Sequence, residues 1–387
     1  MKILQVTAAL DQGGVERGTL EMAQFIASQG AISLVASQGG RLVANLQQGG
    51  IRHISLPLAR RNPLTILYSA FCLHRLIKQE QIDLVHARSR APAWAALLAC
   101  RGSRARMITT FHGTHRIQNR FKRFYNSAMI RGERVIAISH FIRQHIMENY
   151  GLDGSFIDIA PRGYDPDRFE PDAYSRAQKN ALIRSLKLRQ AIPIITLPGR
   201  LTRWKGQPLF LRALAKIEDL DWQALVIGGA GKKTAYLDEL KALSTVLGIA
   251  DRVVFAGDQA DIAPCYAIST LVVSASTEAE AFGRVAVEAQ AMGVPVIASA
   301  HGGSLETVRH GETGWLFRNG DVDDLAAKLR WALDTEDDLL RMGNAAKKWV
   351  EKNYTTARMC RAEWASYLKI TEKNCSADRI ASRNCIT

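Results

Sequence analysis

The chain has 387 residues, of which 47% are hydrophobic and 23% are charged, so it is long enough for two soluble domains with separate cores. We expect no membrane-spanning helix, signal peptide or disulfide framework: no uncharged apolar run reaches about 18 residues, the N-terminal apolar stretch is short, and the six cysteines are scattered without a C-x-x-C pair. The formal net charge of +14 lies mainly in residues 1–170, where there are 22 Lys and Arg but 12 Asp and Glu, so we expect that half to meet an anionic partner.

Short apolar runs alternate with amphipathic segments along the chain. Apolar runs separated by helices are typical of parallel strands that are buried on both faces. We expect strands in the front half at residues 2–7, 32–37, 83–87, 107–113 and 134–139, and in the back half at 193–199, 223–229, 252–257, 271–276, 295–299 and 314–317. The sequence therefore predicts an α/β protein of two doubly wound, Rossmann-like domains that face each other across a cleft.

The connection between the two domains is expected at "PRGYDPDRFEPDAY", which has three prolines and clustered acidic residues. We place the first domain at residues 1–170 and the second at 171–354, with a helix at about 174–188 before its first strand. Residues 355–387 would form a C-terminal helix and a frayed tail. Ligands of doubly wound sheets bind beyond the carboxyl ends of the strands, so residues directly after strands are the candidates for a site.

Gly13 and Gly14 follow the first predicted strand. Their flexibility would let backbone N–H groups approach an anion at the start of the next helix. An ordinary strand-to-helix turn is the alternative. The spacing is neither the dinucleotide fingerprint nor a Walker motif.

His112 ends the strand at 107–113 and precedes Gly113. Its imidazole would hydrogen-bond a sugar hydroxyl or a developing charge, and the alternative is a histidine packed at a strand end. The H-x-x-H spacing with His115 resembles half of a metal site, but no third ligand lies nearby in the sequence, so we predict no metal site.

Arg200 and Lys205 flank the short loop after the strand at 193–199. An arginine fork and a mobile lysine at a helix start suit a diphosphate, whereas the alternative is a solvated basic loop. Arg203 lies between them and is expected at the surface.

Glu280 and Glu288 are separated by seven residues in "EAFGRVAVE". Helical spacing begins at about Arg284, so Glu280 belongs to the preceding loop and Glu288 to the helix. The N–H groups near Phe282 and Gly283 are donors at a helix start. Two carboxylates placed this way would hold two different sugar rings. A glycosidase pair stays open from the spacing alone, but the phosphate site upstream favours a sugar attached to a nucleotide.

In this order, "GGVE", "HG", "GRLTRWKG" and E-x7-E resemble the retaining GT-B glycosyltransferases of family four, the glycosyl transferases group 1, of the bacterial cell-envelope type. "APRGYDPDRF", "LVIGGAG" and "HGGSLETVRHGETGWLF" extend the resemblance from about Met1 to Tyr354. It implies retaining transfer of a hexose-type sugar from a UDP- or GDP-linked donor to a lipid-linked or lipopolysaccharide-type acceptor. The first domain would be on the acceptor side and the second would bind the donor, without a metal or a cofactor other than the donor substrate.

The resemblance also implies roles for individual residues. The catalytic residues would be His112 at the donor sugar, Glu280 at its hydroxyls, and Arg200 and Lys205 at the diphosphate. The donor would further contact Gly13 and Gly14 at the phosphate, Gly257 and Asp258 near the base, Phe282 and Gly283 near the sugar, and Glu288 at the ribose. One departure is Arg162, which replaces a common Asn of the family and would add a charge near the cleft.

The stretch "HRIQNRFKRFYNSAMIRGER", residues 115–134, interleaves basic and apolar residues. It resembles a basic amphipathic helix at an anionic membrane, which predicts a cytoplasmic protein peripheral to the inner face of the cytoplasmic membrane. The alternative is an ordinary solvated helix. A basic nucleic-acid-binding protein and a non-catalytic sugar-nucleotide-binding protein are the rival function classes. The first lacks a recognisable nucleic-acid-binding motif, and the second does not explain the full set of site residues.

Overall fold

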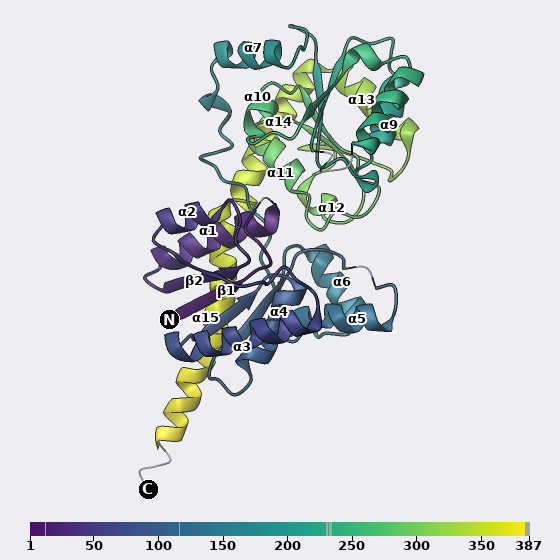
Figure 1. The fold of residues 1–387 in the computed structure, drawn as a ribbon. Helices are drawn as coiled ribbons and strands as arrows, with labels where there is room; N and C mark the ends of the chain where they lie inside the picture. The colour runs from purple at the N-terminus through teal and green to yellow at the C-terminus, as the bar shows by residue number, and fades with distance from the viewer. Residues whose placement is uncertain (12, 116, 230, 232–233, 384–387) are drawn as a thin grey trace. The chain divides into compact units, whose positions relative to one another are not determined.

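The computed structural model describes residues 1–11, 13–115, 117–229, 231 and 234–383, except for the side chains of Glu336 and of residues 372–383. The chain forms two compact units (Figure 1). The first contains residues 1–162 together with the segment from residue 357 onward, and the second contains residues 163–356. Each is a parallel sheet flanked by helices, so the predicted pair of doubly wound α/β domains is confirmed.

The sheet of the first unit has the order β3-β2-β1-β4-β5-β6-β7, with every neighbouring pair parallel. Its strands are β1 (Lys2–Val6), β2 (Ile32–Ser37), β3 (Arg52–Ser55), β4 (Leu84–Ala87), β5 (Arg106–Phe111), β6 (Arg134–Ala137) and β7 (Ile157–Ile159). The sequence analysis missed β3 and β7. Both are short edge strands, and the half-exposed "RHIS" of β3 lacks the continuous apolar run that marked the central strands.

The helices of the first unit are α1 (Gly14–Ser28), α2 (Val43–Gln48), α3 (Pro63–Glu80), α4 (Arg90–Cys100), α5 (Arg120–Asn126), α6 (His140–Tyr150) and the C-terminal α15 (Thr356–Arg383). α15 lies beside β1 in Figure 1 and packs with α1 on one face of the sheet. There Met22 and Ile26 of α1 and Tyr367 of α15 share a core with Ile3 and Leu84 of the central strands. The last helix of the sequence therefore belongs to the core of the first unit.

The second unit repeats this arrangement, with the strand order β10-β9-β8-β11-β12-β13. Its strands are β8 (Ile194–Pro198), β9 (Gln223–Ile227), β10 (Val253–Gly257), β11 (Leu271–Ser274), β12 (Val296–Ser299) and β13 (Gly314–Phe317). Its helices are α7 (Arg176–Ser185), α8 (Gln207–Ala215), α9 (Ala235–Val246), α10 (Ala263–Ala267), α11 (Arg284–Ala291), α12 (Ser304–Thr307), α13 (Val322–Asp334) and α14 (Glu336–Asn353). Both sheets reverse their strand order at one point, between β1 and β4 and between β8 and β11, where such sheets bind ligands.

The boundary between the units differs from the predicted one at 170/171. The chain enters the second unit after Arg162 because the following segment is held there: Tyr164 N–H donates to the Tyr354 carbonyl at 2.8 Å, and Phe169 packs on Tyr266. The chain returns to the first unit after Thr356, whose N–H donates to the Tyr164 carbonyl at 2.8 Å. The two crossing segments are thus hydrogen-bonded to each other. The predicted separate segment 355–387 is mostly α15.

Over the described residues, we find no helix that combines the length and the apolar character needed to cross a membrane.

Substitution of Gly163 by alanine is expected to destabilise the paired crossing segments. A Cβ atom at this position would lie 2.4 Å from the backbone nitrogen of Thr356, so the two segments would have to separate. We expect the free energy of unfolding to fall by about 1–3 kcal/mol, as for other overpacked sites. Chemical denaturation measures this. Gly113→Ala is the matched control, because no atom of the described residues lies within 4 Å of its added Cβ; equal losses in the two variants would contradict the close approach.

Candidate functional site

The carboxyl ends of β8 and β11 bring Lys205 and Glu280 into contact. Lys205 Nζ lies 2.5 Å from Glu280 Oε1, and each side chain is 15% exposed. The two residues are 75 positions apart in the sequence, and they meet because β8 and β11 are parallel neighbours whose following loops share one edge. A cation and a carboxylate that remain partly accessible at this edge suit a ligand with both anionic and hydroxyl groups.

The loop after β8 is shaped by Gly206, which adopts a left-handed conformation with φ 74°. A Cβ atom there would lie 1.8 Å from the carbonyl oxygen of Ala275, so only glycine allows this loop to touch the end of β11. Trp204 stacks under Lys205, with Nζ 4.4 Å from the ring centroid. Gln207 Nε2 donates to the Arg200 carbonyl at 3.1 Å, which fixes the start of the same loop. Arg200 and Lys205 are therefore presented by one ordered turn.

The side chain of Arg203 lies at the surface, as predicted, and not at the contact between Lys205 and Glu280. Its side chain is 74% exposed, pairs with Glu239 at 2.7 Å and stacks on Tyr236. It is the surface member of the three basic residues in this loop.

Glu280 is held from two sides. Ser276 Oγ donates to Glu280 Oε1 at 2.6 Å, and the Glu280 carbonyl accepts from Gly303 N–H at 2.8 Å. His301 Nε2 lies 2.8 Å from the Ser276 carbonyl oxygen, which ties the loop after β12 to the same place. These contacts orient one oxygen of the carboxylate toward Lys205 and fix the loop that carries it.

α11 begins at Arg284, as predicted, after Gly283 in a left-handed conformation with φ 90°. Gly283 has no side chain that could cap this helix start, and the first N–H groups of a helix have no partner within the helix itself. Phe282, 3% exposed, anchors the turn by packing edge-on against Tyr354. The predicted backbone donors of "AFGR" thus lie on a turn fixed by an aromatic core contact.

Glu288 lies one turn into α11 and is 13% exposed. Arg284 Nη2 lies 3.1 Å from its Oε1. Burial, followed by the charge of the nearby Glu288, raises the pKa of the fully buried Tyr266 phenol well above the usual range. The Tyr266 hydroxyl has no hydrogen-bond partner among the described residues. Glu288 and Glu280 therefore have separate ion-pair partners, Arg284 for Glu288 and Lys205 for Glu280.

Gly257 ends β10 and Asp258 follows it, on the other side of β9 from Arg200. Gly257 has φ 68°, and its carbonyl accepts from Gly228 N–H at 2.8 Å. Asp258 is exposed and approaches Gly229. The order β10-β9-β8-β11 thus places Asp258, Arg200 and Glu280 along one sheet edge.

In the first unit, Gly13 is the N-cap of α1, with φ 141°, and Gly14 is its first residue. Gly13 has no side chain that could cap this helix start, and Glu16 Oε2 would lie 2.5 Å from a Cβ atom at Gly13. This is the same local arrangement as at Gly283, a glycine at the N-cap of a helix that follows a central strand. Both predicted glycine turns therefore begin a helix at the carboxyl end of a central strand.

His112 follows β5, and its Nε2 atom is shielded from solvent with no hydrogen-bond partner in the described part of the chain. Burial, followed by the charges of Arg162 and Arg88, holds the pKa of His112 well below its usual range. The imidazole is therefore neutral at physiological pH. His115 packs against Phe111, and burial lowers its pKa to about 3. Among the residues that the structure describes, no three His, Cys, Asp or Glu side chains gather as metal ligands would.

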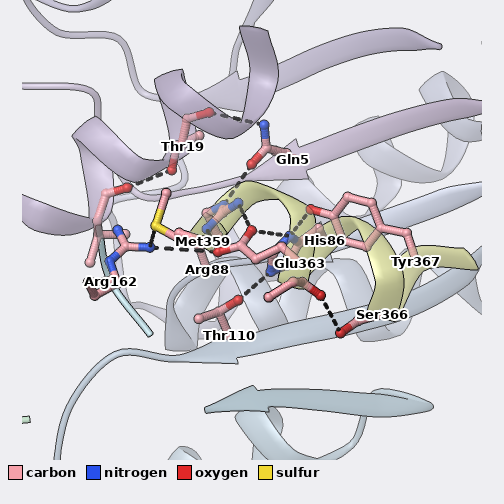
Figure 2. Close-up of polar contacts among 12 residues, drawn as sticks. Gln5, Thr19, His86, Arg88, Thr110, Arg162, Met359, Glu363, Ser366 and Tyr367 are labelled. Carbon is pink, nitrogen blue, oxygen red and sulfur yellow. Dashed lines mark hydrogen bonds and ion pairs between the residues drawn. The ribbon is translucent and has the colours of Figure 1, made fainter. Parts of the chain in front are cut away.

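A buried polar network lies under the glycine turn of the first unit (Figure 2). Arg162 was predicted to add a charge near the cleft, but its side chain is 3% exposed and belongs to this network, which corrects that prediction. Glu363 of α15 lies 2.6 Å from Arg88 Nη2 and 3.6 Å from Arg162 Nη1. Sequence alone placed none of these residues together, because Glu363 is far away in the chain.

The basic stretch 115–134 is less regular than predicted. Only α5 and a 3₁₀ turn at Ser127–Ile130 are helical, and Arg116 lies outside the described residues. Met129 is fully buried, and Arg134 pairs with Asp158 at 2.6 Å, so both belong to the fold rather than to a surface stripe. Phe121, 87% exposed, remains an outward apolar side chain on α5.

Sequence reasoning missed Ser276, His301 and Tyr266. Ser276 has a signal that predicts it, because it ends an apolar strand four residues before Glu280. His301 and Tyr266 have none, since each reaches the site from a separate loop or helix.

Comparison with known proteins gives two family matches. The model described as "Glycosyl transferases group 1" matches residues 178–349, and that described as "Glycosyltransferase Family 4" matches residues 12–168. The GDP-mannose-dependent alpha-(1-6)-phosphatidylinositol monomannoside mannosyltransferase of Mycobacterium tuberculosis is 33% identical over 294 residues, which are 72% of this chain and 74% of that protein. The D-inositol 3-phosphate glycosyltransferase of a Mycobacterium species is 36% identical over 56% of this chain and 46% of its own length.

Solved structures agree with these matches. A glycosyltransferase from Rickettsia africae is 36% identical, with a TM-score of 0.89 over 96% of this chain and 98% of that chain. Anabaena HepE, solved with UDP and glucose, is 23% identical with a TM-score of 0.82 over 95% and 99% of the two chains, which shows a shared fold. The predicted GT-B fold class is thereby confirmed.

The contact between Lys205 and Glu280 predicts coupled stability effects. Glu280→Gln and Lys205→Met are each expected to lower the free energy of unfolding by about 1–3 kcal/mol, because each leaves a mostly buried charge without its partner. The double variant should lose less than the sum of the two. Chemical denaturation of the three variants gives the coupling energy.

Arg203→Met is the control for this cycle, because it breaks an ion pair whose partners are 74% and 52% exposed. Its effect should stay within about 0.5 kcal/mol. Strictly additive losses at Lys205 and Glu280 would show that the two side chains do not interact in solution.

Proposed function

This chain belongs to the glycosyl transferases group 1 family, and on that premise we propose that it is a retaining, metal-independent hexosyltransferase of envelope glycan synthesis. Its donor would be a UDP- or GDP-linked sugar and its acceptor a lipid-linked or lipopolysaccharide-type glycan. The names of two relatives support this class, because one uses GDP-mannose with a phosphatidylinositol glycolipid and the other acts on inositol 3-phosphate.

The observation that carries the proposal is the contact between Lys205 and Glu280. In a sugar nucleotide the distal phosphate and the transferred sugar are joined by one oxygen, so their ligands on the protein must be neighbours. Lys205 Nζ and Glu280 Oε1 are 2.5 Å apart and remain 15% exposed. A donor would replace this ion pair by two contacts, phosphate on Lys205 and sugar hydroxyls on Glu280.

The other residues of the second unit fit the rest of the donor. Arg200 would bind the diphosphate with its guanidinium fork. The start of α11 at Phe282 and Gly283 would donate N–H groups to phosphate or sugar oxygens. Glu288 would accept from the ribose hydroxyls, and Gly257 and Asp258 would lie beside the base.

Residues of the first unit would complete the donor contacts. Gly13 and Gly14 would offer the N-terminus of α1 to the phosphate. His112 would hydrogen-bond the donor sugar through a neutral imidazole, which its lowered pKa supports. His112 Nε2 has no hydrogen-bond partner among the described residues, which supports this role, because a buried nitrogen without a partner is costly unless a ligand satisfies it.

In the proposed reaction, the bond between the anomeric carbon and the distal phosphate oxygen breaks, and the acceptor hydroxyl oxygen forms the new bond on the same face. The leaving diphosphate takes the acceptor proton. Arg200 and Lys205 would stabilise the charge that develops on the leaving group, which is binding of the transition state in preference to the ground state. Their positive charge would take the place that a divalent metal has in other transferases.

A panel of sugar nucleotides tests the donor assignment without an acceptor. UDP-glucose, UDP-N-acetylglucosamine and GDP-mannose are compared with UDP and GDP by thermal shift. One sugar nucleotide should stabilise the protein more than its free nucleotide does, because a ligand bound only by the folded state adds about 2.7 kcal/mol at a hundredfold excess over Kd. Glu280→Ala should lose the sugar-dependent part and slow transfer about 100-fold or more.

Glu278→Ala is the matched control for Glu280→Ala, since Glu278 is an exposed acidic residue two positions earlier. It should keep both the sugar-dependent stabilisation and the turnover. Near-normal transfer by Glu280→Ala, or a wild-type chain stabilised by none of these nucleotides, would refute the assigned donor site.

We also propose that α3 and α5 of the first unit bind an anionic membrane. One side of α3 carries four outward apolar residues at helical spacing, which are Leu64 (80% exposed), Leu67 (55%), Tyr68 (58%) and Phe71 (59%). Both helices flank α4: α3 packs along it, and Trp94 of α4 stacks on Phe124 of α5. Arg75 of α3 stacks on Phe71, and further basic residues precede α3 or lie on α5, namely Arg60, Arg61, Arg120, Lys122 and Arg123. Apolar side chains flanked by cations suit the interface of anionic lipids.

Vesicle co-sedimentation tests this surface. The chain should bind phosphatidylglycerol vesicles more strongly than phosphatidylcholine vesicles, and Leu64→Asp with Leu67→Asp should weaken that binding about tenfold, since each change removes an apolar contact and adds a negative charge. Leu340→Asp is the control, because Leu340 is a 71% exposed leucine on α14 of the other unit. Binding that ignores lipid charge would contradict the proposal.

A further inference from the structure

We propose that Arg162 is a positioning residue for the proposed transfer: it fixes the glycine turn at the start of α1 by tying Gly14 to the C-terminal helix α15. This inference rests on the proposed function for its consequence, although the contacts themselves lie within the first unit. The family resemblance assigns a common Asn, not Arg, to this position.

The contacts of Arg162 run in two directions (Figure 2). Its Nη2 donates to the Gly14 carbonyl, and its Nη1 donates to Met359 Sδ at 3.4 Å and lies 3.6 Å from Glu363 Oε1. One planar guanidinium therefore joins the first residue of α1 to two residues of α15. An Asn side chain is too short to make both connections and carries no charge.

The Gly14 carbonyl matters because the peptide bond that follows it is planar and trans. The carbonyl of Gly14 and the N–H of Val15 lie in that plane and point in opposite directions. When Arg162 holds the carbonyl toward the interior, the Val15 N–H is aimed out of the helix start, where an anion would bind. Arg162 thus sets the direction of a donor group that it does not itself touch.

The position of Gly18 is independent evidence that α1 leaves space for the Arg162 guanidinium. A Cβ atom at Gly18 would lie 2.0 Å from Arg162 Nη2 and 2.6 Å from its Cζ. Gly18 lies inside a helix, where glycine usually costs stability relative to alanine. A missing methyl group here leaves room for the guanidinium against the helix backbone.

Glu363, the residue of α15 near Arg162, is itself held in place by further contacts. Glu363 is fully buried, and Arg88 binds it through two nitrogens, at 2.6 and 3.3 Å. Arg88 Nε also donates to Gln5 Oε1 at 2.7 Å, and Gln5 Nε2 donates to the Thr19 carbonyl of α1 at 3.1 Å. A second route therefore links Glu363 back to α1, and a closed ring of contacts holds the helix on both sides of its first turn.

The same network adds to the effect of burial on the protonation of His112. The charged or titratable groups that face it are Arg162, Arg88 with its partner Glu363, His86 and His115. The positive charges of Arg162 and Arg88 add to burial in lowering the pKa of His112. Removal of the Arg162 charge therefore raises the pKa of His112, and the acidic limb of a reaction that needs the neutral imidazole moves to higher pH.

Three variants separate the effect of the Arg162 contact with Gly14 from the effect of the Arg162 positive charge. Arg162→Asn removes both, Arg162→Lys keeps the charge but loses the fork, and Gly18→Ala keeps the charge while its methyl group displaces the guanidinium. Turnover is followed as release of UDP or GDP from the sugar nucleotide that stabilises the wild-type chain most. Arg162→Asn and Gly18→Ala should raise the donor KM about tenfold, the effect of one lost charge-assisted hydrogen bond.

The pH profile of kcat distinguishes Arg162→Asn from Arg162→Lys. Its acidic limb should move to higher pH in Arg162→Asn and stay near that of the wild-type chain in Arg162→Lys. Arg134→Asn is the matched control, because it breaks an ion pair with Asp158 in the same unit, with side chains 17% and 11% exposed, away from α1. It should lower the melting temperature but leave the donor KM and the pH profile unchanged.

Hydrogen–deuterium exchange of residues 14–20 gives a readout that is independent of activity. Exchange at the first turn of α1 should accelerate in Arg162→Asn and Gly18→Ala but not in Arg134→Asn. Unchanged exchange, or an Arg162→Asn variant that loses stability while its donor KM and pH profile match Arg134→Asn, overturns the positioning role. A wild-type chain without turnover counts instead against the proposed function, and the exchange result still decides whether Arg162 holds the turn.

Discussion

Both units depend on one constraint, the parallel alignment of strands in a doubly wound sheet. Parallel strands present all their carboxyl ends at one edge, and the reversal of strand order between β8 and β11 leaves space there for a ligand. Lys205 and Glu280 meet for this reason, although 75 residues separate them. The same reversal between β1 and β4 brings the glycine turn after β1 near Arg88, which follows β4. The two units thus share one sheet arrangement but place different side chains at the point of reversal.

Close backbone approaches turn this common scaffold into defined sites. Gly206 touches the end of β11, and the loops after β8 and β9 meet where a Cβ at Gly228 would lie 2.0 Å from the Gly199 carbonyl oxygen. Each of these glycines has a positive φ, so both sterics and backbone conformation select it. The side chains that follow, Arg200 and Lys205, are therefore carried by backbone that has little freedom to move, which is what a site for a charged ligand requires.

The sequence predicts local features of this protein well and long-range ones poorly. The eleven expected strands, the helix start at Arg284 and the exposed position of Arg203 follow from periodicity and turn chemistry, and the structure contains all of them. The edge strands β3 and β7 were not predicted because short, half-polar strands have a weak hydrophobic pattern in the sequence. The role of Arg162 escaped for a different reason. A buried arginine looks like a surface arginine in sequence until its partner, Glu363, is known.

The discontinuity of the first unit sets an order for its folding during synthesis. Arg88 and Glu363 are separated by 275 residues, and the whole second unit is made between them. A nascent chain that ends before α15 must leave Arg88 solvated or bury it without its carboxylate, at a cost of several kcal/mol. The second unit, which is continuous in sequence, can therefore complete its core first, and α15 closes the first unit last. The first unit can therefore complete its fold only after both units have been synthesised.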